Sequence, residues 1–171
     1  MILEALKKEH SKLNTLAIVN YVGSDPKRFE ELLAVFSLKD IRLSQRAAWP
    51  LTCIAENQPD LIQPHLSVIV DLLDNPLHVA VKRNVMRSLR DFDLPENLLG
   101  NIADKAFVFL MDHKEAIAVR AFSMTVLYKI CLKEPDLKNE LIPIIEDMLQ
   151  YGCSPGLKSY GKKMLKALHK I

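Results

Sequence analysis

The stretch Ala80-Val81-Lys82-Arg83-Asn84-Val85 recurs along the chain, and this recurrence decides the fold. A similar stretch, Ala118-Val119-Arg120-Ala121-Phe122, stands 37 residues later, and Ser44-Gln45-Arg46-Ala47-Ala48 stands 37 residues earlier. A further step of 38 residues reaches Gly156-Leu157-Lys158-Ser159-Tyr160. Each copy carries a cation at the matching position: Arg46, Arg83, Arg120 and Lys158. A repeat of this length predicts stacked pairs of helices.

The composition also favours helices. Hydrophobic residues make up 49% of the chain and charged residues 26%, which is typical of a globular protein. Aromatic residues are only 6%, and Leu, Ile, Val and Ala supply the apolar side chains. Alternating β-branched runs and Asn-Gly or Asp-Gly turns are absent from the sequence. We predict one domain over residues 1–171, long enough to bury about 70% of its unfolded surface.

Apolar spacing and turn residues divide the chain into helices. The first segment runs from about Ile2 to Val22, with Leu13, Leu16, Ala17 and Tyr21 at helical spacing and a possible break near His10-Ser11. Pro26 opens the next helix, which extends to Phe36. Each later unit is a first helix, a short turn and a second helix that carries the recurrent cation. The second helices are predicted over 40–56, 77–92, 114–132 and 155–171, and the first helices between them over 59–73, 95–111 and 134–149. We predict an all-α, right-handed α-α superhelix of about four helical pairs plus an N-terminal helix.

This pattern resembles the HEAT-repeat family over nearly the whole chain, and small bacterial HEAT-like proteins in particular. The resemblance rests on a turn Asp (Asp40, Asp74, Asp112), a following Val-Arg or its equivalent, and a Pro near the start of first helices. It implies a HEAT-like solenoid whose second helices line the concave face. The six-residue spacing from Asp40 to Arg46 becomes nine and eight residues in the next two copies. The resemblance therefore implies an Asp–Arg contact only for the first pair, Asp40 and Arg46.

The predicted core consists of apolar residues on the inward faces of these helices. They are Leu32, Leu51, Ile54, Ile69, Leu72, Val85, Leu89, Phe107, Leu110, Phe122, Leu127, Ile145 and Leu165.

Charge is unevenly divided between the two sets of helices. Counted over 40–56, 77–92, 114–133 and 155–171, the second helices carry 15 Lys and Arg against 4 Asp and Glu. Counted over 26–36, 59–73, 95–112 and 134–150, the first helices carry 4 against 12. With the resemblance, this implies a basic inner surface, which attracts extended anionic partners. We predict an acidic protein or peptide segment as partner, bound by Arg42, Arg46, Trp49, Arg83, Arg87, Arg90, Arg120, Lys158 and Lys162.

Two alternatives accompany these binding residues. Arg46, Arg83 and Arg120 have a structural interpretation of equal weight, in which they bond turn carboxylates or helix ends of neighbouring repeats. Trp49 stands directly before Pro50, which is costly inside a helix, so the helix either kinks there or begins later. Trp49 is then either a stacking platform beside Arg42 and Arg46 or, the interpretation we favour, a filler for the gap left by a kink.

Enzyme signatures are missing from the sequence. The five His form no His-x-x-x-His pair, and the chain has no Cys-x-x-Cys pair, phosphate-binding Gly-rich loop or Gly-x-Ser-x-Gly elbow. We predict no cofactor, no metal and no enzymatic activity. The alternative is a nucleic-acid-binding protein similar in fold to the HEAT-like alkylpurine DNA glycosylases, with Asp91 as the nearest match to their carboxylate.

The remaining sequence features concern the protein's location. Three cysteines, Cys53, Cys131 and Cys153, have no paired spacing and are predicted to be reduced thiols in the cytoplasm. The N-terminus lacks a signal-peptide pattern, and the longest apolar run, from Ala106 to Met111, is far shorter than a membrane span.

Overall fold

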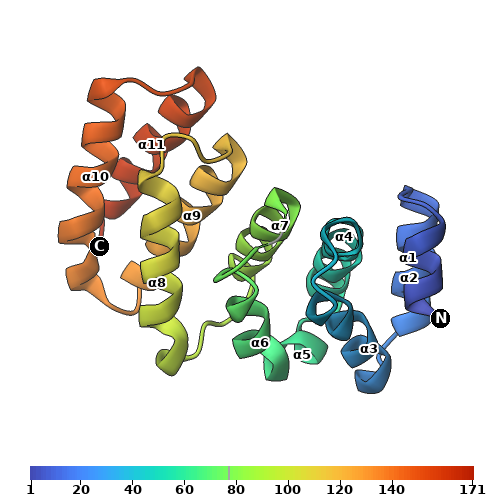
Figure 1. The fold of residues 1–171 in the computed structure, drawn as a ribbon. Coiled ribbons are helices and arrows are strands. Elements are labelled where there is room, and N and C mark those ends of the chain that lie inside the picture. Colours follow the sequence, from blue (N-terminus) through green and yellow to red (C-terminus); the bar gives the residue numbers. More distant parts are fainter. Residues whose placement is uncertain (77) are drawn as a thin grey trace. The chain divides into compact units, whose positions relative to one another are not determined.

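A computed structural model describes residues 1–76 and 78–171, and every regular element in these ranges is a helix (Figure 1). The prediction of an all-α chain is confirmed. The chain divides into two compact units, unit 1 (Met1–Phe92) and unit 2 (Asp93–Ile171). A single domain over 1–171 and a right-handed superhelix stay predictions.

Unit 1 has two layers of helices. Its elements are α1 (Ile2–Lys8), α2 (Lys12–Val22), α3 (Pro26–Ser37), α4 (Ile41–Asn57), α5 (Pro59–Ile62), the 3-10 turn η1 (Gln63–His65), α6 (Leu66–Asp71) and α7 (Val79–Leu89). The first helices α3, α5 and α6 form the lower row in Figure 1, and the second helices α4 and α7 form the upper row. The predicted start of the 77–92 helix, Leu77, lies outside the described residues.

The N-terminal segment is a pair of helices rather than a single one. Its predicted break is confirmed, because Ser11 Oγ accepts a hydrogen bond from Asn14 N and begins α2. The predicted apolar face was wrong, since Leu13 is 77% exposed and Leu16 43% exposed. The apolar pattern of α2 has two candidate stripes, and packing against its neighbours buries the other one, at Thr15, Ile18 and Val22.

Aspartates cap the helices that follow. Asp25 Oδ1 accepts hydrogen bonds from the backbone nitrogens of Lys27 and Arg28, and Pro26 occupies the first helical position. Asp40 Oδ1 accepts from Leu43 N at 2.8 Å. The turn aspartate at 40 therefore serves as an N-cap, and α4 begins one residue after it.

Two prolines have opposite effects on their helices. The predicted helix 59–73 is divided into α5, η1 and α6, because Pro64 has no N–H to donate and its ring crowds the preceding turn. By contrast, α4 runs from Ile41 to Asn57 with Pro50 inside it. The alternative in which the helix begins after Pro50 was wrong.

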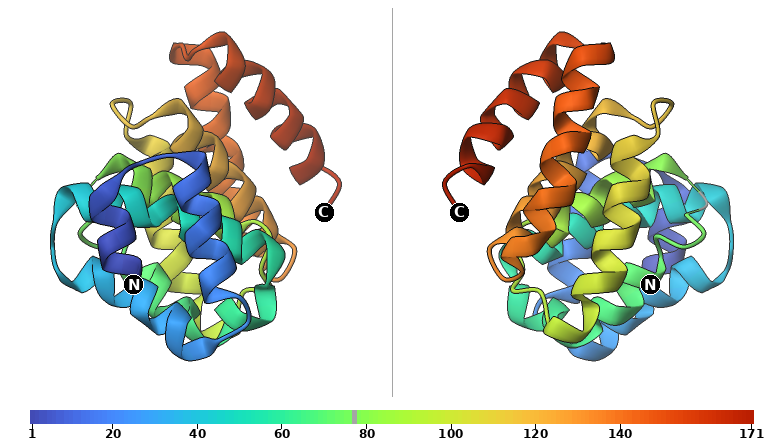
Figure 2. Two further views of the ribbon diagram at one scale, coloured as in Figure 1. Left: turned by 90° about the vertical axis from the view of Figure 1, so that its right-hand side faces the viewer. Right: turned by 90° about the vertical axis from the view of Figure 1, so that its left-hand side faces the viewer.

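Unit 2 repeats the two-layer arrangement. Its elements are α8 (Glu96–Met111), α9 (Ile117–Cys131), the 3-10 turn η2 (Pro135–Leu137), α10 (Lys138–Tyr151) and α11 (Pro155–Leu168). The first helices α8 and α10 lie side by side, and the second helices α9 and α11 pack behind them (Figures 1 and 2). A Cβ atom on Gly161 of α11 would lie 3.1 Å from Met148 Cε of α10, so these two helices approach closely there.

The predicted core is largely confirmed. Ten of its members are buried: Leu32, Leu51, Ile54, Ile69, Val85, Leu89, Phe107, Leu110, Leu127 and Ile145. The other three, Leu72, Phe122 and Leu165, are only half-buried. Phe122 and Leu165 lie at the margin of a buried helical stripe, where the neighbouring Ser123 and Met164 are buried instead. Leu72 follows the end of α6, where the next residue, Leu73, is the buried one.

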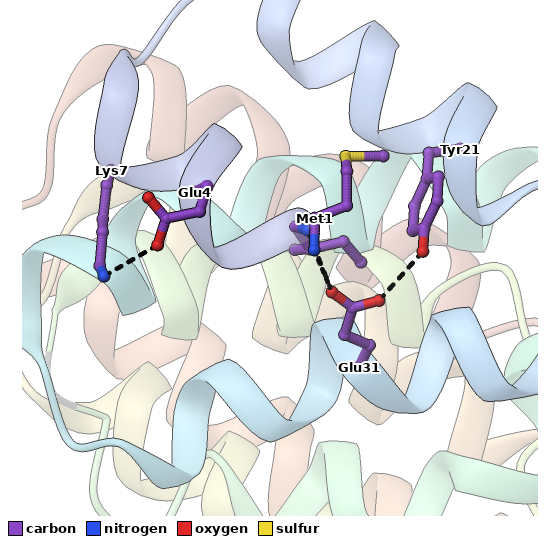
Figure 3. A network of polar contacts seen from close by, with 6 residues as sticks. Met1, Glu4, Lys7, Tyr21 and Glu31 are labelled. Atoms are coloured by element: carbon purple, nitrogen blue, oxygen red, sulfur yellow. Dashed lines mark hydrogen bonds and ion pairs between the residues drawn. The ribbon is translucent and has the colours of Figure 1, made fainter.

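A polar network joins the start of the chain to α3 (Figure 3). The Met1 amino group donates to Glu31 Oε1 at 3.0 Å, Ile2 N donates to the same oxygen, and the Tyr21 hydroxyl donates to Oε2. The hydrogen bond from the amino group is the main cause that lowers the pKa of Glu31 below its usual 4.5. The carboxylate is therefore held in its charged form.

Candidate functional site

Helical spacing places two predicted binding residues of α4 and one carboxylate on the same exposed stripe. Arg42, Trp49 and Glu56 stand seven residues apart, and all three are exposed. Of the residues between them on the same side, Cys53 is half-buried and Arg46 is buried. Fourteen residues of helix are about 21 Å long, so this stripe runs for most of α4.

The neighbouring helix α7 presents a second exposed stripe. Arg83 and Arg87 are both exposed, one helical turn apart. Arg87 Nη2 lies 2.6 Å from Glu56 Oε1, and Thr52 Oγ1 reaches the carbonyl of Asn84 at 3.4 Å. These contacts between α4 and α7 bring the two stripes together. We call Arg42, Trp49, Glu56, Arg83 and Arg87 the α4–α7 surface.

The three arginines of this surface differ in whether they have an ion-pair partner. Within residues 1–76 and 78–171, neither Arg42 nor Arg83 has an ion-pair partner or a side-chain hydrogen bond. The charge of Arg87 is partly neutralised by Glu56. Arg42 and Arg83 are therefore the groups best able to take an anionic ligand.

Trp49 lies at the edge of the surface. Its side chain is 36% exposed, and its ring meets that of His10 edge-on with the ring centroids 5.8 Å apart. His10 belongs to the connection between α1 and α2, and these two helices lie on the other side of α4 from α7 (Figure 1). The indole thus remains partly open to a ligand while one edge is held in place.

A comparison with known protein families decides what kind of fold these helical pairs make. The model of the HEAT repeat domain matches residues 2–168. The chain belongs to the HEAT repeat family. HEAT repeats generally mediate protein interactions. Neither the curated proteins nor the solved structures provide a match to this HEAT-repeat protein.

Two of the recurrent arginines hold helix ends of this HEAT-repeat protein. Arg46 is 9% exposed and its Nη1 donates to the carbonyls of Leu6 and Lys7, at the end of α1. Arg120 is 6% exposed and its Nε donates to the carbonyl of Leu110, near the end of α8. This geometry matches the structural alternative for both residues. Arg46 donates to these carbonyls, and Asp40 caps α4. The hydrogen bonds described for these two residues therefore do not include the Asp–Arg contact that the resemblance implied.

The remaining predicted residues are distributed over both units. Arg90 is half-buried, and its Nε donates to the carbonyl of Arg87. Asp91, the nearest match to a glycosylase carboxylate, is exposed just after α7. Lys158 and Lys162 are exposed on α11 of unit 2. They form a separate basic stripe in that unit, and their role in binding stays a prediction.

Two thiols of this HEAT-repeat protein, those of Cys53 and Cys131, are poor nucleophiles. Burial raises the pKa of the Cys53 thiol, the Glu56 carboxylate raises it further, and Arg87 opposes this increase. Burial raises the pKa of Cys131 to about 11. Both thiols are therefore protonated near neutral pH, which makes them unreactive.

Metal sites and membrane-spanning helices are both missing from the described part of the chain. Among the residues that the structure describes, no three His, Cys, Asp or Glu side chains gather closely enough to hold a metal ion. None of the described helices combines the length and the hydropathy needed to cross a bilayer.

Sequence reasoning missed two features of the site. The ion pair between Glu56 and Arg87 has no local signature, because the two residues are on different helices. The contact between His10 and Trp49 depends on the turn between α1 and α2, which brings a loop residue against α4. Only the heptad spacing of Arg42, Trp49 and Glu56 offered a sequence signal for the surface.

Proposed function

We propose that this HEAT-repeat protein is a non-enzymatic interaction scaffold in which the α4–α7 surface binds an acidic, extended segment of a partner protein. The single observation that carries this proposal is the pair of unpartnered guanidinium groups, Arg42 and Arg83, on two adjoining helices. Each is available to form charge-assisted hydrogen bonds with a carboxylate.

The dimensions of the surface favour a short peptide. The stripe from Arg42 to Glu56 is about 21 Å long, at about 1.5 Å of rise per residue of helix. An extended chain advances about 3.3 Å per residue, so about six residues of a partner cover this length. Two carboxylates near the two free arginines and an apolar side chain near Trp49 complete the expected motif.

The negative charge of Glu56 sets the register of the ligand. Glu56 lies at the far end of the α4 stripe and is paired with Arg87. A carboxylate of the partner placed next to Glu56 is repelled, whereas one near Arg42 or Arg83 is attracted. We therefore expect the acidic residues of the partner at the Arg42 end and a neutral or basic residue at the Glu56 end.

Fluorescence anisotropy with synthetic peptides tests this proposal. The probe is a labelled peptide of about eight residues that combines Glu with Leu, and the matched peptide carries Gln in place of Glu. We expect saturable binding of the first peptide. The double variant Arg42→Ala/Arg83→Ala should bind it about tenfold more weakly, because two charge-assisted contacts are removed.

The matched control is Lys12→Ala/Lys27→Ala, which removes two exposed cations of unit 1 that lie outside the α4–α7 surface. It should leave the affinity within about twofold of the wild type, since exposed charges act weakly at a distance in salt. Equal loss in both double variants, or equal binding of the Gln peptide, would reject the proposal.

A further inference from the structure

A pocket of about 280 Å³ opens in unit 1 between the α3–α4 turn and the loop that follows α6. Its apolar part is formed by Phe36, Leu72, Pro76 and Val81, and its polar part by Lys39, Ser44, Asp71 and Asn75. These residues are separate from the α4–α7 surface, so a role for the pocket does not rest on the proposed function.

The charged groups around this pocket have no partner among the residues that the structure describes. Across residues 1–76 and 78–171, the side chains of Lys39, Asp71 and Asn75 take part in no hydrogen bond or ion pair. One free cation, one free carboxylate and one free amide thus surround a common apolar floor. Such a combination suits a ligand that carries both signs of charge and an apolar portion.

Ser44 adds an independent observation. Ser44 is one of the lining residues of this pocket, it is only 1% exposed, and its Oγ is buried with no hydrogen-bond partner among the described residues. Buried hydroxyl groups are nearly always paired, because leaving one unpaired forfeits its bonds to water without replacement. A polar atom held inside the pocket would supply the missing partner.

Lys39 stands in a backbone conformation that favours glycine. Its φ is +53°, in the left-handed region, and a side chain there costs conformational energy. A glycine would end α3 at lower cost but would remove the only cation among the described lining residues. Lys39 thus combines a strained backbone conformation with an ammonium group that makes no ion pair to the described residues.

The equivalent place in unit 2 shows what is particular to this pocket. A cavity of about 420 Å³ occurs there, with Leu110 and His113 standing 74 residues after Phe36 and Lys39. In that cavity the buried cation Arg120 already donates to the carbonyl of Leu110. Its described lining includes no hydroxyl side chain. Of these two pockets, the one in unit 1 alone combines unpartnered charges with an orphaned hydroxyl among its described residues.

We propose that the unit 1 pocket binds a small zwitterion with an apolar side chain, of the class of free aliphatic α-amino acids. The carboxylate of the ligand pairs with Lys39, its ammonium group pairs with Asp71, and its side chain lies on Phe36, Leu72 and Val81. The volume is just below the range of about 300–1,000 Å³ typical of drug-sized ligands, so an amino acid fits the available space.

Titration of the ¹⁵N-labelled full chain with L-leucine, followed by NMR, tests this assignment. We expect saturable shifts of the backbone amides of Lys39, Ser44, Asp71 and Asn75. N-acetyl-L-leucine lacks the ammonium charge and L-leucinamide lacks the carboxylate. Each should bind at least about tenfold more weakly, because one charge-assisted contact is lost.

Three variants locate the contacts. Lys39→Gly and Asp71→Asn should each weaken L-leucine binding by about tenfold or more, and Ser44→Ala by several-fold. Lys39→Gly should also melt at the same or a higher temperature than the wild type, because the left-handed backbone no longer carries a side chain. A loss of binding in this variant therefore does not reflect unfolding.

The matched control is Glu30→Gln, which removes an exposed carboxylate of unit 1 that is not part of the pocket lining. It should bind L-leucine as the wild type does. Three results would each overturn the assignment: no shift of the four amides at tens of millimolar L-leucine, equal binding of the two blocked derivatives, or wild-type affinity in both Lys39→Gly and Asp71→Asn.

Discussion

Arg46 Nη1 donates a hydrogen bond of 2.6 Å to the carbonyl oxygen of Leu6, 40 residues earlier in the chain. The same nitrogen reaches the carbonyl of Lys7 at 3.0 Å. The last carbonyls of a helix have no partner within the helix, and they carry the negative end of its dipole. A buried guanidinium meets both needs at the end of α1, and Arg120 makes the same kind of contact with the carbonyl of Leu110 near the end of α8.

Replacing Arg46 by Ala should lower the free energy of unfolding by about 2–4 kcal/mol. The variant loses charge-assisted hydrogen bonds, leaves two carbonyls unpaired and opens a cavity. Urea unfolding followed by circular dichroism measures the change. The exposed Arg42→Ala serves as control and should stay within about 0.5 kcal/mol of the wild type. An equally small effect of Arg46→Ala would contradict the structural role.

Asp40 should act on stability as a helix cap rather than as a partner of arginine. Asp40→Ala removes the acceptor of the Leu43 N–H and should cost about 1 kcal/mol. Asp40→Asn keeps an acceptor oxygen and should lose much less, whereas a salt-bridge role predicts similar losses for both variants. Thermal or urea unfolding of the pair distinguishes the two cases.

Two glycines of α11 should respond differently to the same substitution. Gly156→Ala meets no atom within 4 Å, so the better helix propensity of Ala should raise the free energy of unfolding by up to about 1 kcal/mol. At Gly161, the new Cβ lies 3.1 Å from Met148 Cε and 3.3 Å from Ile145 Cγ2. We expect Gly161→Ala to be less stable than Gly156→Ala by about 1–3 kcal/mol in urea unfolding.

The carboxylate of Glu31 should make part of the stability depend on pH. Its pKa is lowered in the folded state, chiefly by the Met1 amino group, so the unfolded chain binds the proton more tightly. The contribution of Glu31 is then fully present above its usual pKa of 4.5 and is lost as pH falls through the lower folded value. Urea midpoints between pH 6 and about pH 3 should therefore fall less steeply for Glu31→Gln than for the wild type. Parallel curves for the two proteins would show that the contact is not formed in solution.

Salt dependence should separate a protein ligand from the nucleic-acid alternative. For a phosphate backbone, log affinity falls with log salt by about 0.9 for each neutralised phosphate. We expect no measurable binding of mixed-sequence DNA or RNA at physiological salt in a filter-binding series, because few cations of the α4–α7 surface are unpaired. Tight binding with a slope steeper than about −4, flattened by about two contacts in Arg42→Ala/Arg83→Ala, would favour the alternative instead.

The sequence alone determined the class and the order of the elements. Cations repeating every 37 or 38 residues, prolines at helix starts and apolar residues at helical spacing all depend on local geometry. These signals are sufficient for helical pairs and for most of the core. In α2, two stripes of the helix are apolar, and the local pattern does not show whether the stripe with Leu16 or the one with Ile18 is buried.

Only the tertiary structure decided what the charged residues do. Arg46 and Arg83 occupy matching places in the repeat, yet one is buried against α1 and the other is exposed. The difference arises because Arg46 faces the end of a packed N-terminal helix, whereas Arg83 faces solvent. In the same way, Ser44 became part of a pocket through the loop that follows α6. A side chain's partner depends on which elements pack beside it, and that information is absent from local spacing.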